Sequence, residues 1–271
     1  MPELPEVEVT RRRITPHIQG KTIFDVTVRN ADLRRPVPSE IRTELPGQII
    51  QDVERRGKYL LFRCPAGWII LHLGMTGDVK IISARTAPEK HDHLDIVFRD
   101  GICLRFNDTR RFGSILWTES DPKDHPLLKR LGPEPLTDTF TAQYIFRRSR
   151  GRSIAVKQFI MDGTVVAGLG NIYASEALFG AGIHPAMEAG TISLVLYRRL
   201  VETIKTVLLT AIEEGMAAFK ESISDERASG YFPVTLHVYG RSGEPCHRCG
   251  ATIRQFRQAG RSTCFCPVCQ R

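Results

Sequence analysis

The spacing of apolar and polar residues changes along the chain and predicts a different structure for each part. The first 15 residues predict a helix, because apolar residues recur at helical spacing and prolines suit its first turn. Pro16 is expected to end or kink this helix. From residue 21 to residue 118 the apolar residues come in short runs that are typical of strands. The clearest runs are 22–28, 59–64, 68–73, 79–82, 94–98 and 102–106.

Short strands separated by glycine or aspartate turns favour an antiparallel sandwich or barrel. Residues 121–139 hold four prolines and predict a linker, and residues 141–222 then return to helical spacing. The longest amphipathic segment runs from residue 193 to residue 219. The last part, from about residue 230 to residue 271, is rich in turns, and we expect two short strands there.

The composition is that of an ordinary globular protein with an excess of basic side chains. Of the 271 residues, 42% are hydrophobic, and no apolar run is long enough to span a membrane. The first residues do not resemble a secretory signal, so we expect a cytoplasmic protein without a membrane partner. A net charge of +8 favours a polyanionic partner, although the charge alone is equally consistent with a merely basic protein.

Four of the seven cysteines form a pattern that is typical of a zinc site. They are arranged as C-x2-C, sixteen residues and C-x2-C: Cys246, Cys249, Cys266 and Cys269. Four thiolates at this spacing predict one structural zinc ion with a closed tetrahedral shell. Cys264 and His247 lie close by and are left outside the ligand set, whereas Cys64 and Cys103 are expected to be buried thiols. Arginines in the same tail indicate either a phosphate-binding surface or an ordinary solvated face.

The second residue offers a separate chemistry. A small residue after Met1 allows removal of the methionine, which would expose Pro2 as a secondary amine. An α-amino group is far more often a free base at neutral pH than a lysine is, and it can attack the anomeric carbon of a sugar to give an iminium. Glu3 and Glu6 would place carboxylates nearby for proton transfer. The alternative is an ordinary helix start, in which the prolines and acidic residues serve only the helix.

Nine motifs follow one another along nearly the whole chain. They are 2–8 (PELPEVE), 57–59 (GKY), 72–75 (HLGM), 90–93 (KHDH), 107–113 (NDTRRFG), 168–176 (GLGNIYASE), 182–185 (GIHP), 238–241 (VYGR) and the cysteine tail. In this combination and order the chain resembles the formamidopyrimidine-DNA glycosylase family. The opening motif favours this branch over the related endonuclease VIII branch.

The resemblance implies an α+β multidomain fold with an N-terminal antiparallel β-sandwich, a helix-two-turn-helix domain and a C-terminal zinc finger. We expect the catalytic helix and the sandwich in residues 1–120, a linker in 121–140, the helical domain in 141–229 and the zinc finger in 230–271. The implied partner is damaged double-stranded DNA, bound across a cleft by a monomer. The implied reaction is excision of 8-oxoguanine or a formamidopyrimidine opposite cytosine, followed by β- and δ-elimination, with no organic cofactor.

The resemblance also assigns roles to residues at the reaction centre. Pro2 would be the nucleophile, Glu3 the acid or base, and Glu6 a supporting carboxylate. Lys58 would contact a phosphate near the lesion and assist catalysis. Arg261 would bind phosphate and also serve the second elimination.

The remaining implied roles concern the DNA around the lesion. Three side chains, Met75, Arg110 and Phe112, would fill the gap left by the extruded base, and Arg110 would read the orphaned cytosine. The further DNA contacts are His72, His91, Arg152, Asn171 and Tyr239. Without the resemblance, the apolar members of this set would be interpreted as core residues and the charged members as solvated surface.

Two departures from the family pattern leave alternatives open. Residues 217–229 differ from the stretch that caps the extruded base in many members, which puts the preferred lesion in doubt, and Cys264 stands where an aromatic residue is usual. One alternative function is therefore a sister activity on oxidised pyrimidines. Another is a damage-binding protein without catalysis, which is the expectation if Met1 is retained and the Pro2 nitrogen stays in a peptide bond.

Overall fold

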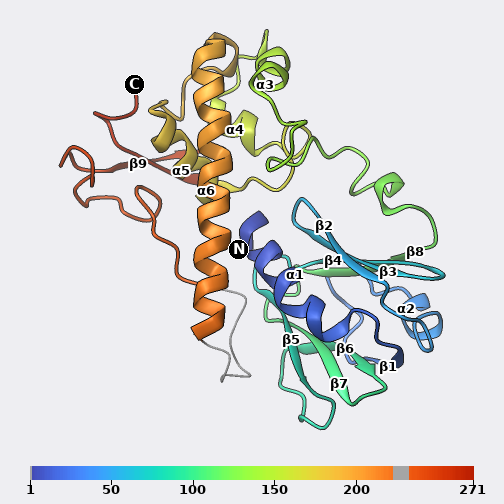
Figure 1. Ribbon diagram of the computed structural model, residues 1–271. Helices are drawn as coiled ribbons and strands as arrows, with labels where there is room; N and C mark the ends of the chain where they lie inside the picture. The colour runs from blue at the N-terminus through green and yellow to red at the C-terminus, as the bar shows by residue number, and fades with distance from the viewer. Residues whose placement is uncertain (1, 222–231) are drawn as a thin grey trace. The chain divides into compact units, whose positions relative to one another are not determined.

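The computed structural model describes residues 2–221 and 232–271 (Figure 1). Contacts between Cα atoms divide the chain into two compact units. Unit 1 comprises Met1–Lys129 and Glu214–Pro233, and unit 2 comprises Arg130–Glu213 and Val234–Arg271. No helix in these two described stretches is long and apolar enough to cross a membrane.

Unit 1 opens with the helix α1 (Leu4–Ile18), which lies beside the strands of this unit (Figure 1). Pro16 lies inside the helix, so the expectation that it ends the helix there is wrong, whereas a kink at Pro16 stays a prediction. A proline this close to the end removes only one helical hydrogen bond, and the backbone N–H of Gln19 still bonds to the carbonyl of Thr15 at 3.0 Å. Ile18 is fully buried in the core, which holds the last turn in place.

Two antiparallel four-stranded sheets form the rest of unit 1. In the first sheet the strand order is β1 (Ile23–Val28), β6 (Asp92–Phe98), β7 (Ile102–Asp108) and β5 (Gly77–Ser83). In the second sheet the order is β2 (Asp52–Arg56), β3 (Tyr59–Cys64), β4 (Gly67–His72) and β8 (Ser114–Thr118). Apolar side chains from both sheets and from α1 share one buried cluster, so the predicted β-sandwich is confirmed.

The sequence pattern did not single out β2 and β8. Both are edge strands of the second sheet, and in β2 only Val53 is buried, so an alternating apolar pattern is missing. Cys64 and Cys103 are buried, as predicted, and burial raises the pKa of each thiol to about 12. A short helix, α2 (Glu40–Thr43), precedes β2, and a single 3-10 turn, η1 (Pro122–Asp124), lies in the predicted linker.

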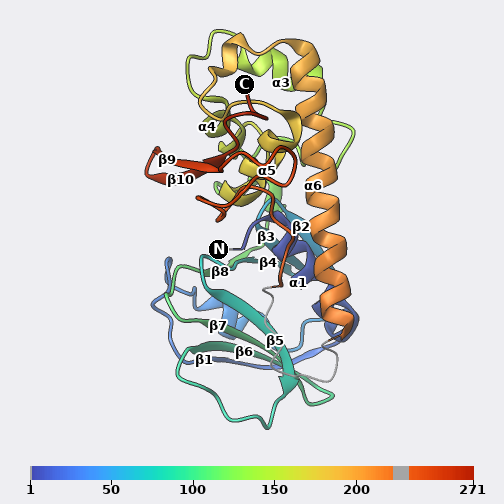
Figure 2. The ribbon, with the colours of Figure 1, turned by 90° about the vertical axis from the view of Figure 1, so that its left-hand side faces the viewer.

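Unit 2 is mainly helical. Its elements are α3 (Ala142–Ser149), α4 (Val156–Met161), α5 (Asn171–Ala181), the 3-10 turn η2 (Ala189–Thr191), most of α6 (Leu194–Glu221), and the strands β9 (Arg254–Gln258) and β10 (Arg261–Phe265). These are the two short strands predicted for the tail, and they pair in an antiparallel hairpin. Within this unit α5 contacts both α4 and β10, and Figure 2 shows the three elements side by side. Of residues 217–229, the first five belong to α6 and 222–229 lie outside the described residues.

Candidate functional site

The predicted reaction centre lies at the N-terminus of α1. Glu3 is the N-cap residue, and it forms a capping box with Glu6, whose Oε2 accepts the backbone N–H of Glu3 at 2.7 Å. Pro2 and both glutamates are buried. The capping box fixes the backbone of Glu3, and therefore the direction in which the preceding residue leaves the helix. The positive end of the helix dipole also faces Pro2.

A second carboxylate of α1 connects this helix to the turn that carries Lys58. Oε2 of Glu8 accepts Nε–H of Arg55 at 3.0 Å, and Nη1 of Arg55 donates to the carbonyl of Gly57 at 3.0 Å. Gly57 has a φ of 57°, which suits glycine in the tight turn between β2 and β3. Lys58 follows in this turn and is half-buried.

His72 ends β4 directly opposite Tyr59, and the centroids of the two rings are 4.7 Å apart. Burial lowers the pKa of His72 to about 4, and the charges of Lys58 and Arg34 act in the same direction. Nδ1 of His72 accepts the backbone N–H of Gly74 at 3.0 Å. His72 is therefore neutral at physiological pH, with its proton on Nε2, and it can donate a hydrogen bond from that atom.

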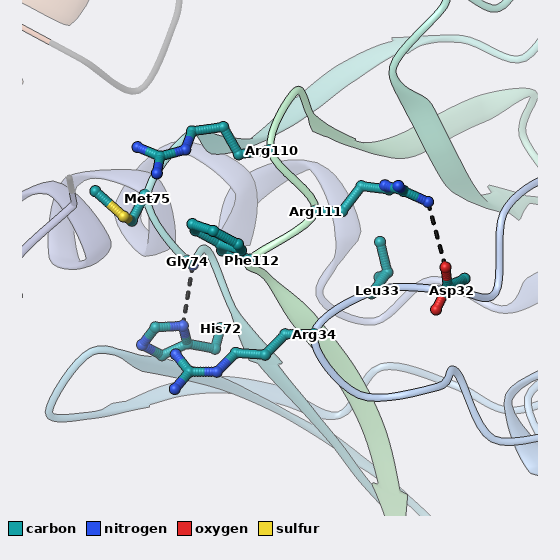
Figure 3. A pocket seen from close by; sticks show the side chains of 9 residues that line it. All are labelled: Asp32, Leu33, Arg34, His72, Gly74, Met75, Arg110, Arg111 and Phe112. Atoms are coloured by element: carbon teal, nitrogen blue, oxygen red, sulfur yellow. Dashed lines mark hydrogen bonds and ion pairs between the residues drawn. The ribbon is translucent and has the colours of Figure 1, made fainter.

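The three predicted gap-filling residues line one cavity of about 610 Å³ together with His72 (Figure 3). Met75 lies in the turn between β4 and β5, and Arg110 and Phe112 lie in the loop between β7 and β8. Phe112 is 40% exposed, and the guanidinium of Arg110 lies over its ring at 4.7 Å. Such a degree of exposure is unusual for a core phenylalanine, so the core interpretation of Phe112 is not supported.

The two loops of this cavity touch at Gly74. Its φ is 66°, and a Cβ atom there would lie 2.4 Å from the backbone nitrogen of Gly113 and 2.4 Å from the carbonyl carbon of Phe112. Only glycine therefore allows this approach. The cavity is also strongly basic, because Arg34 and Arg111 line it as well, and among its described lining residues only Arg111 has an acidic partner, Asp32 at 3.3 Å.

In unit 2, Asn171 and Arg261 line a second cavity, of about 170 Å³. Asn171 is the first residue of α5, and its Nδ2 donates to the carbonyl of Ser262 at 3.1 Å. The buried Lys157 also lines this cavity, and its Nζ donates to the same carbonyl at 3.0 Å. The start of β10, which carries Arg261, is thus held against α4 and α5 by two side chains.

Tyr239 is positioned by the middle of the same helix. Glu176 on α5 is buried, and its Oε1 accepts the backbone N–H groups of Val238 at 3.0 Å and Tyr239 at 2.8 Å. Its Oε2 accepts the N–H of His237 at 2.8 Å. Side chains of α5 therefore hold the backbone of two segments that carry predicted phosphate-binding residues, the start of β10 with Arg261 and the segment with Tyr239.

Besides Tyr239, two further predicted DNA contacts line neither cavity. His91 is half-buried and precedes β6, where its carbonyl accepts the backbone N–H of Asp108 at 3.0 Å. Arg152 is exposed between α3 and α4, and its backbone bonds to Ser149 and Gly190. Pro2, Glu3 and Lys58 also lie outside the lining of the cavity in unit 1.

The four predicted zinc ligands lie together in the tail. Their Sγ atoms are all within 4.8 Å of one another, and two pairs, Cys246–Cys269 and Cys249–Cys266, are 3.9 Å and 3.5 Å apart. Zinc–sulfur bonds of about 2.3 Å in a tetrahedron require sulfur atoms about 3.8 Å apart, so the thiols fit the ion. Cys264 is buried beside Gln255 and is not part of the cluster.

The structure adds residues to these sites that sequence reasoning did not select. Arg34 lines the cavity in unit 1, and its charge lowers the pKa of His72. In the sequence, the arginine pair at 34–35 gave no indication of a functional site. Lys157 and Glu176 anchor the segments of unit 2. A lysine or glutamate inside an otherwise apolar helical stretch is a usable signal, because such residues are seldom buried without a specific partner.

Models of three domain families match successive parts of the chain. The formamidopyrimidine-DNA glycosylase N-terminal domain matches residues 1–115, and the formamidopyrimidine-DNA glycosylase H2TH domain matches residues 131–222. The zinc finger found in FPG and IleRS matches residues 243–271. With the four clustered thiols, this last match identifies one structural zinc site in the tail.

Curated relatives and solved structures cover the whole chain. The formamidopyrimidine-DNA glycosylases of Geotalea uraniireducens and Methylococcus capsulatus are 55% and 54% identical, with complete coverage of both chains. Lactococcus lactis Fpg, solved in complex with abasic-site DNA, has a TM-score of 0.89 at 34% identity, again with complete coverage of both chains. MutM (Fpg) from Thermus thermophilus has a TM-score of 0.85 at 37% identity, covering 99% of this chain and 98% of the other. The chain therefore belongs to the formamidopyrimidine-DNA glycosylase family.

Proposed function

We propose that this protein repairs oxidised purines in duplex DNA, acting on 8-oxoguanine and formamidopyrimidines as a glycosylase and then as a lyase at the abasic site. Among the observations within the chain, the one that carries the proposal is the N-terminus of α1, where Pro2 directly precedes a capping box of two buried glutamates. Solved relatives support the substrate class, because Lactococcus lactis Fpg has been crystallised with abasic-site DNA and with Fapy-dG DNA.

The amine of Pro2 carries the chemistry once Met1 has been removed. Its nitrogen bonds to C1′ of the damaged nucleotide while the bond from C1′ to the base breaks, and the base leaves with a proton. Glu3 protonates O4′, so the sugar ring opens to an iminium between the proline nitrogen and C1′. The helix dipole favours the neutral amine over the ammonium ion, which makes the nucleophile available at neutral pH.

The iminium then accepts electrons as the strand is cut. Loss of a proton from C2′ expels the 3′ phosphate, and loss of a second proton from C4′ expels the 5′ phosphate. Water finally releases the sugar fragment and restores the amine. We assign Lys58 and Arg261 to the phosphates that leave, because a cation beside the departing oxygen stabilises its developing charge.

The other predicted residues bind the DNA that surrounds this centre. His72 in unit 1 and Asn171 and Tyr239 in unit 2 donate hydrogen bonds to phosphates of the damaged strand, and Asn171 does so beside the backbone N–H groups at the start of α5. His91 and Arg152 add further backbone contacts. Extruding the base costs a few kcal/mol, and Met75, Arg110 and Phe112 offset this cost by filling the gap in the duplex.

We further propose that the protein acts as a monomer on DNA in the cytoplasm. A single chain carries every residue assigned above, so no second copy is required. Four thiolate ligands for zinc also suit a reducing compartment. The state of association is tested by sedimentation of the zinc-loaded protein with and without a lesion duplex.

The reaction is tested by trapping the iminium. Protein whose intact mass establishes loss of Met1 is incubated with a duplex that holds one 8-oxoguanine opposite cytosine, in the presence of borohydride. Reduction of the iminium gives a stable bond between protein and DNA, which we expect to see as a band of higher mass. The matched control carries one extra residue before Pro2, and it should give no band.

Each alternative function has its own outcome in this assay. Retention of Met1 together with tight binding and no band would indicate a damage-binding protein. A panel that also holds an oxidised pyrimidine and an abasic site separates the sister activity, which would trap and cut the pyrimidine duplex faster than the 8-oxoguanine duplex.

A further inference from the structure

One buried carboxylate joins the two loops of the cavity in unit 1. Asp108 ends β7 and is fully buried. Its Oδ1 accepts the hydroxyl of Thr76 at 2.6 Å and the backbone N–H of Arg110 at 3.2 Å. Its Oδ2 accepts the backbone N–H of Gly113 at 2.7 Å. Thr76 belongs to the β4–β5 turn, whereas the two N–H groups belong to the β7–β8 loop, so Asp108 holds both loops. The hydroxyl that Asp108 holds also accepts the backbone N–H of Arg110, with Thr76 Oγ1 at 3.1 Å from that nitrogen.

The carboxylate is itself held rigidly by the sheet. The backbone N–H of Asp108 donates to the carbonyl of His91 at 3.0 Å, and Nε2 of His93 donates to the carbonyl of Asp108 at 2.7 Å. Within residues 2–221 and 232–271, no cationic side chain forms an ion pair with Asp108. The two buried carboxylate oxygens therefore have the three hydrogen bonds from the loops as their partners, which makes the geometry of these bonds demanding.

The loops that Asp108 joins carry Met75, Arg110 and Phe112. Figure 3 shows these three side chains around the same cavity, coming from two different loops. The close approach at Gly74 keeps the loop backbones in contact but does not itself fix the direction of either loop. The hydrogen bonds of Asp108 supply that restraint, because they act on the residue after Met75 and on both sides of Phe112.

We propose that Asp108 is a positioning residue for duplex recognition, which holds the two loops so that their three side chains enter the gap opposite the extruded base together. This inference rests on the proposed function and deepens it. Asp108 does not touch the reacting atoms. Its contribution to recognition therefore applies to a duplex, where the gap must be filled and the opposite cytosine read. A single strand has no such gap and no opposite cytosine, so the contribution does not apply there.

The test uses variants that break one anchor while keeping the shape of the side chain. In D108N, either orientation of the amide places an NH₂ group against a backbone N–H, of Arg110 or of Gly113, so residue 108 loses one hydrogen bond to the β7–β8 loop. The N–H of Arg110 still has the Thr76 hydroxyl as an acceptor, and T76V removes that acceptor. T76V removes the hydroxyl anchor, and T76S keeps it. The matched control is D95N, which alters another buried carboxylate of the same sheet, one that pairs with Arg105 and Arg29 instead of the loops.

Two substrates are compared for each variant under single-turnover conditions. We expect D108N and T76V to excise 8-oxoguanine opposite cytosine at least about tenfold more slowly than wild type, because a displacement of about 1 Å at a positioned group has effects of this order. On a single-stranded oligonucleotide with an abasic site, borohydride trapping by the same variants should stay within about twofold of wild type. D95N and T76S should match wild type on both substrates.

Several outcomes would overturn the inference. D108N and T76V could excise from the duplex at the wild-type rate, or lose activity equally on both substrates, or be no slower than D95N. The T76V and T76S pair decides the matter if D108N does not fold. Failure of the wild-type protein on both substrates would instead refute the proposed function, and the inference with it.

Discussion

The network around Glu8 leads to a quantitative prediction about stability. Burial alone would raise the pKa of Glu8, but hydrogen bonds from Arg11 and Arg12, with the charge of Arg55, lower it from 4.5 to about 2. This difference corresponds to about 3 kcal/mol at about 1.4 kcal/mol for each pH unit. Since Arg12 is 45% exposed, solvent screens part of the interaction, and we expect about 2 kcal/mol to remain.

The direction of the pKa shift of Glu8 determines the pH range in which its contribution to stability is lost. The carboxylate is held ionised in the folded protein, so its contribution is fully present above pH 4.5 and is lost as the pH falls toward 2. E8Q lacks this contribution at every pH. The difference in free energy of unfolding between wild type and E8Q should therefore be about 2 kcal/mol at pH 7 and less than about half of that at pH 3.

Tryptophan fluorescence provides a suitable assay. The chain has two tryptophans, Trp68 and Trp117, and both lie in unit 1 with Glu8. Denaturant unfolding followed by fluorescence therefore reports the unit that contains the network. E44Q is a matched control, because Glu44 is exposed. A difference between wild type and E8Q that stays constant from pH 7 to pH 3 would refute the reasoning.

Two further predictions concern DNA binding. His72 is neutral and can donate a hydrogen bond through Nε2, so H72F should weaken binding to a lesion duplex about tenfold. The slope of log affinity against log salt concentration should not change, whereas removing a charged contact lowers that slope by about one. A lower slope in H72F would show that the ring is charged, and H72Q, which keeps a donor, is the control. Chelation of zinc should abolish binding while leaving the tryptophan signal unchanged, since the cysteines lie in unit 2. Binding that survives chelation, or fails to return when zinc is added, would contradict the structural role of the metal.

The predictions from sequence succeeded where the signal is local. Four cysteines at fixed spacing define a metal site whatever the rest of the chain does, because each C-x2-C pair is brought together by a single turn. The strands were found where several apolar residues face the core, as in β3 and β6. They were missed in β2, where only Val53 is buried. Pro16 was expected to end or kink α1. The helix continues to Ile18, because a proline this close to the end removes only one helical hydrogen bond and because Ile18 is buried in the core.

The sequence by itself determined the order of the elements, the zinc ligands and, through nine ordered motifs, the family. Only the tertiary structure decided which groups act on one another. Glu8 and Arg55 are 47 residues apart, and Thr76 and Asp108 are 32 apart, so no local pattern couples them. The pKa of His72 likewise depends on Lys58 and Arg34, which other segments bring to it. Such effects arise from burial and from charges brought close by folding, and these are properties of distances in space that sequence spacing does not contain.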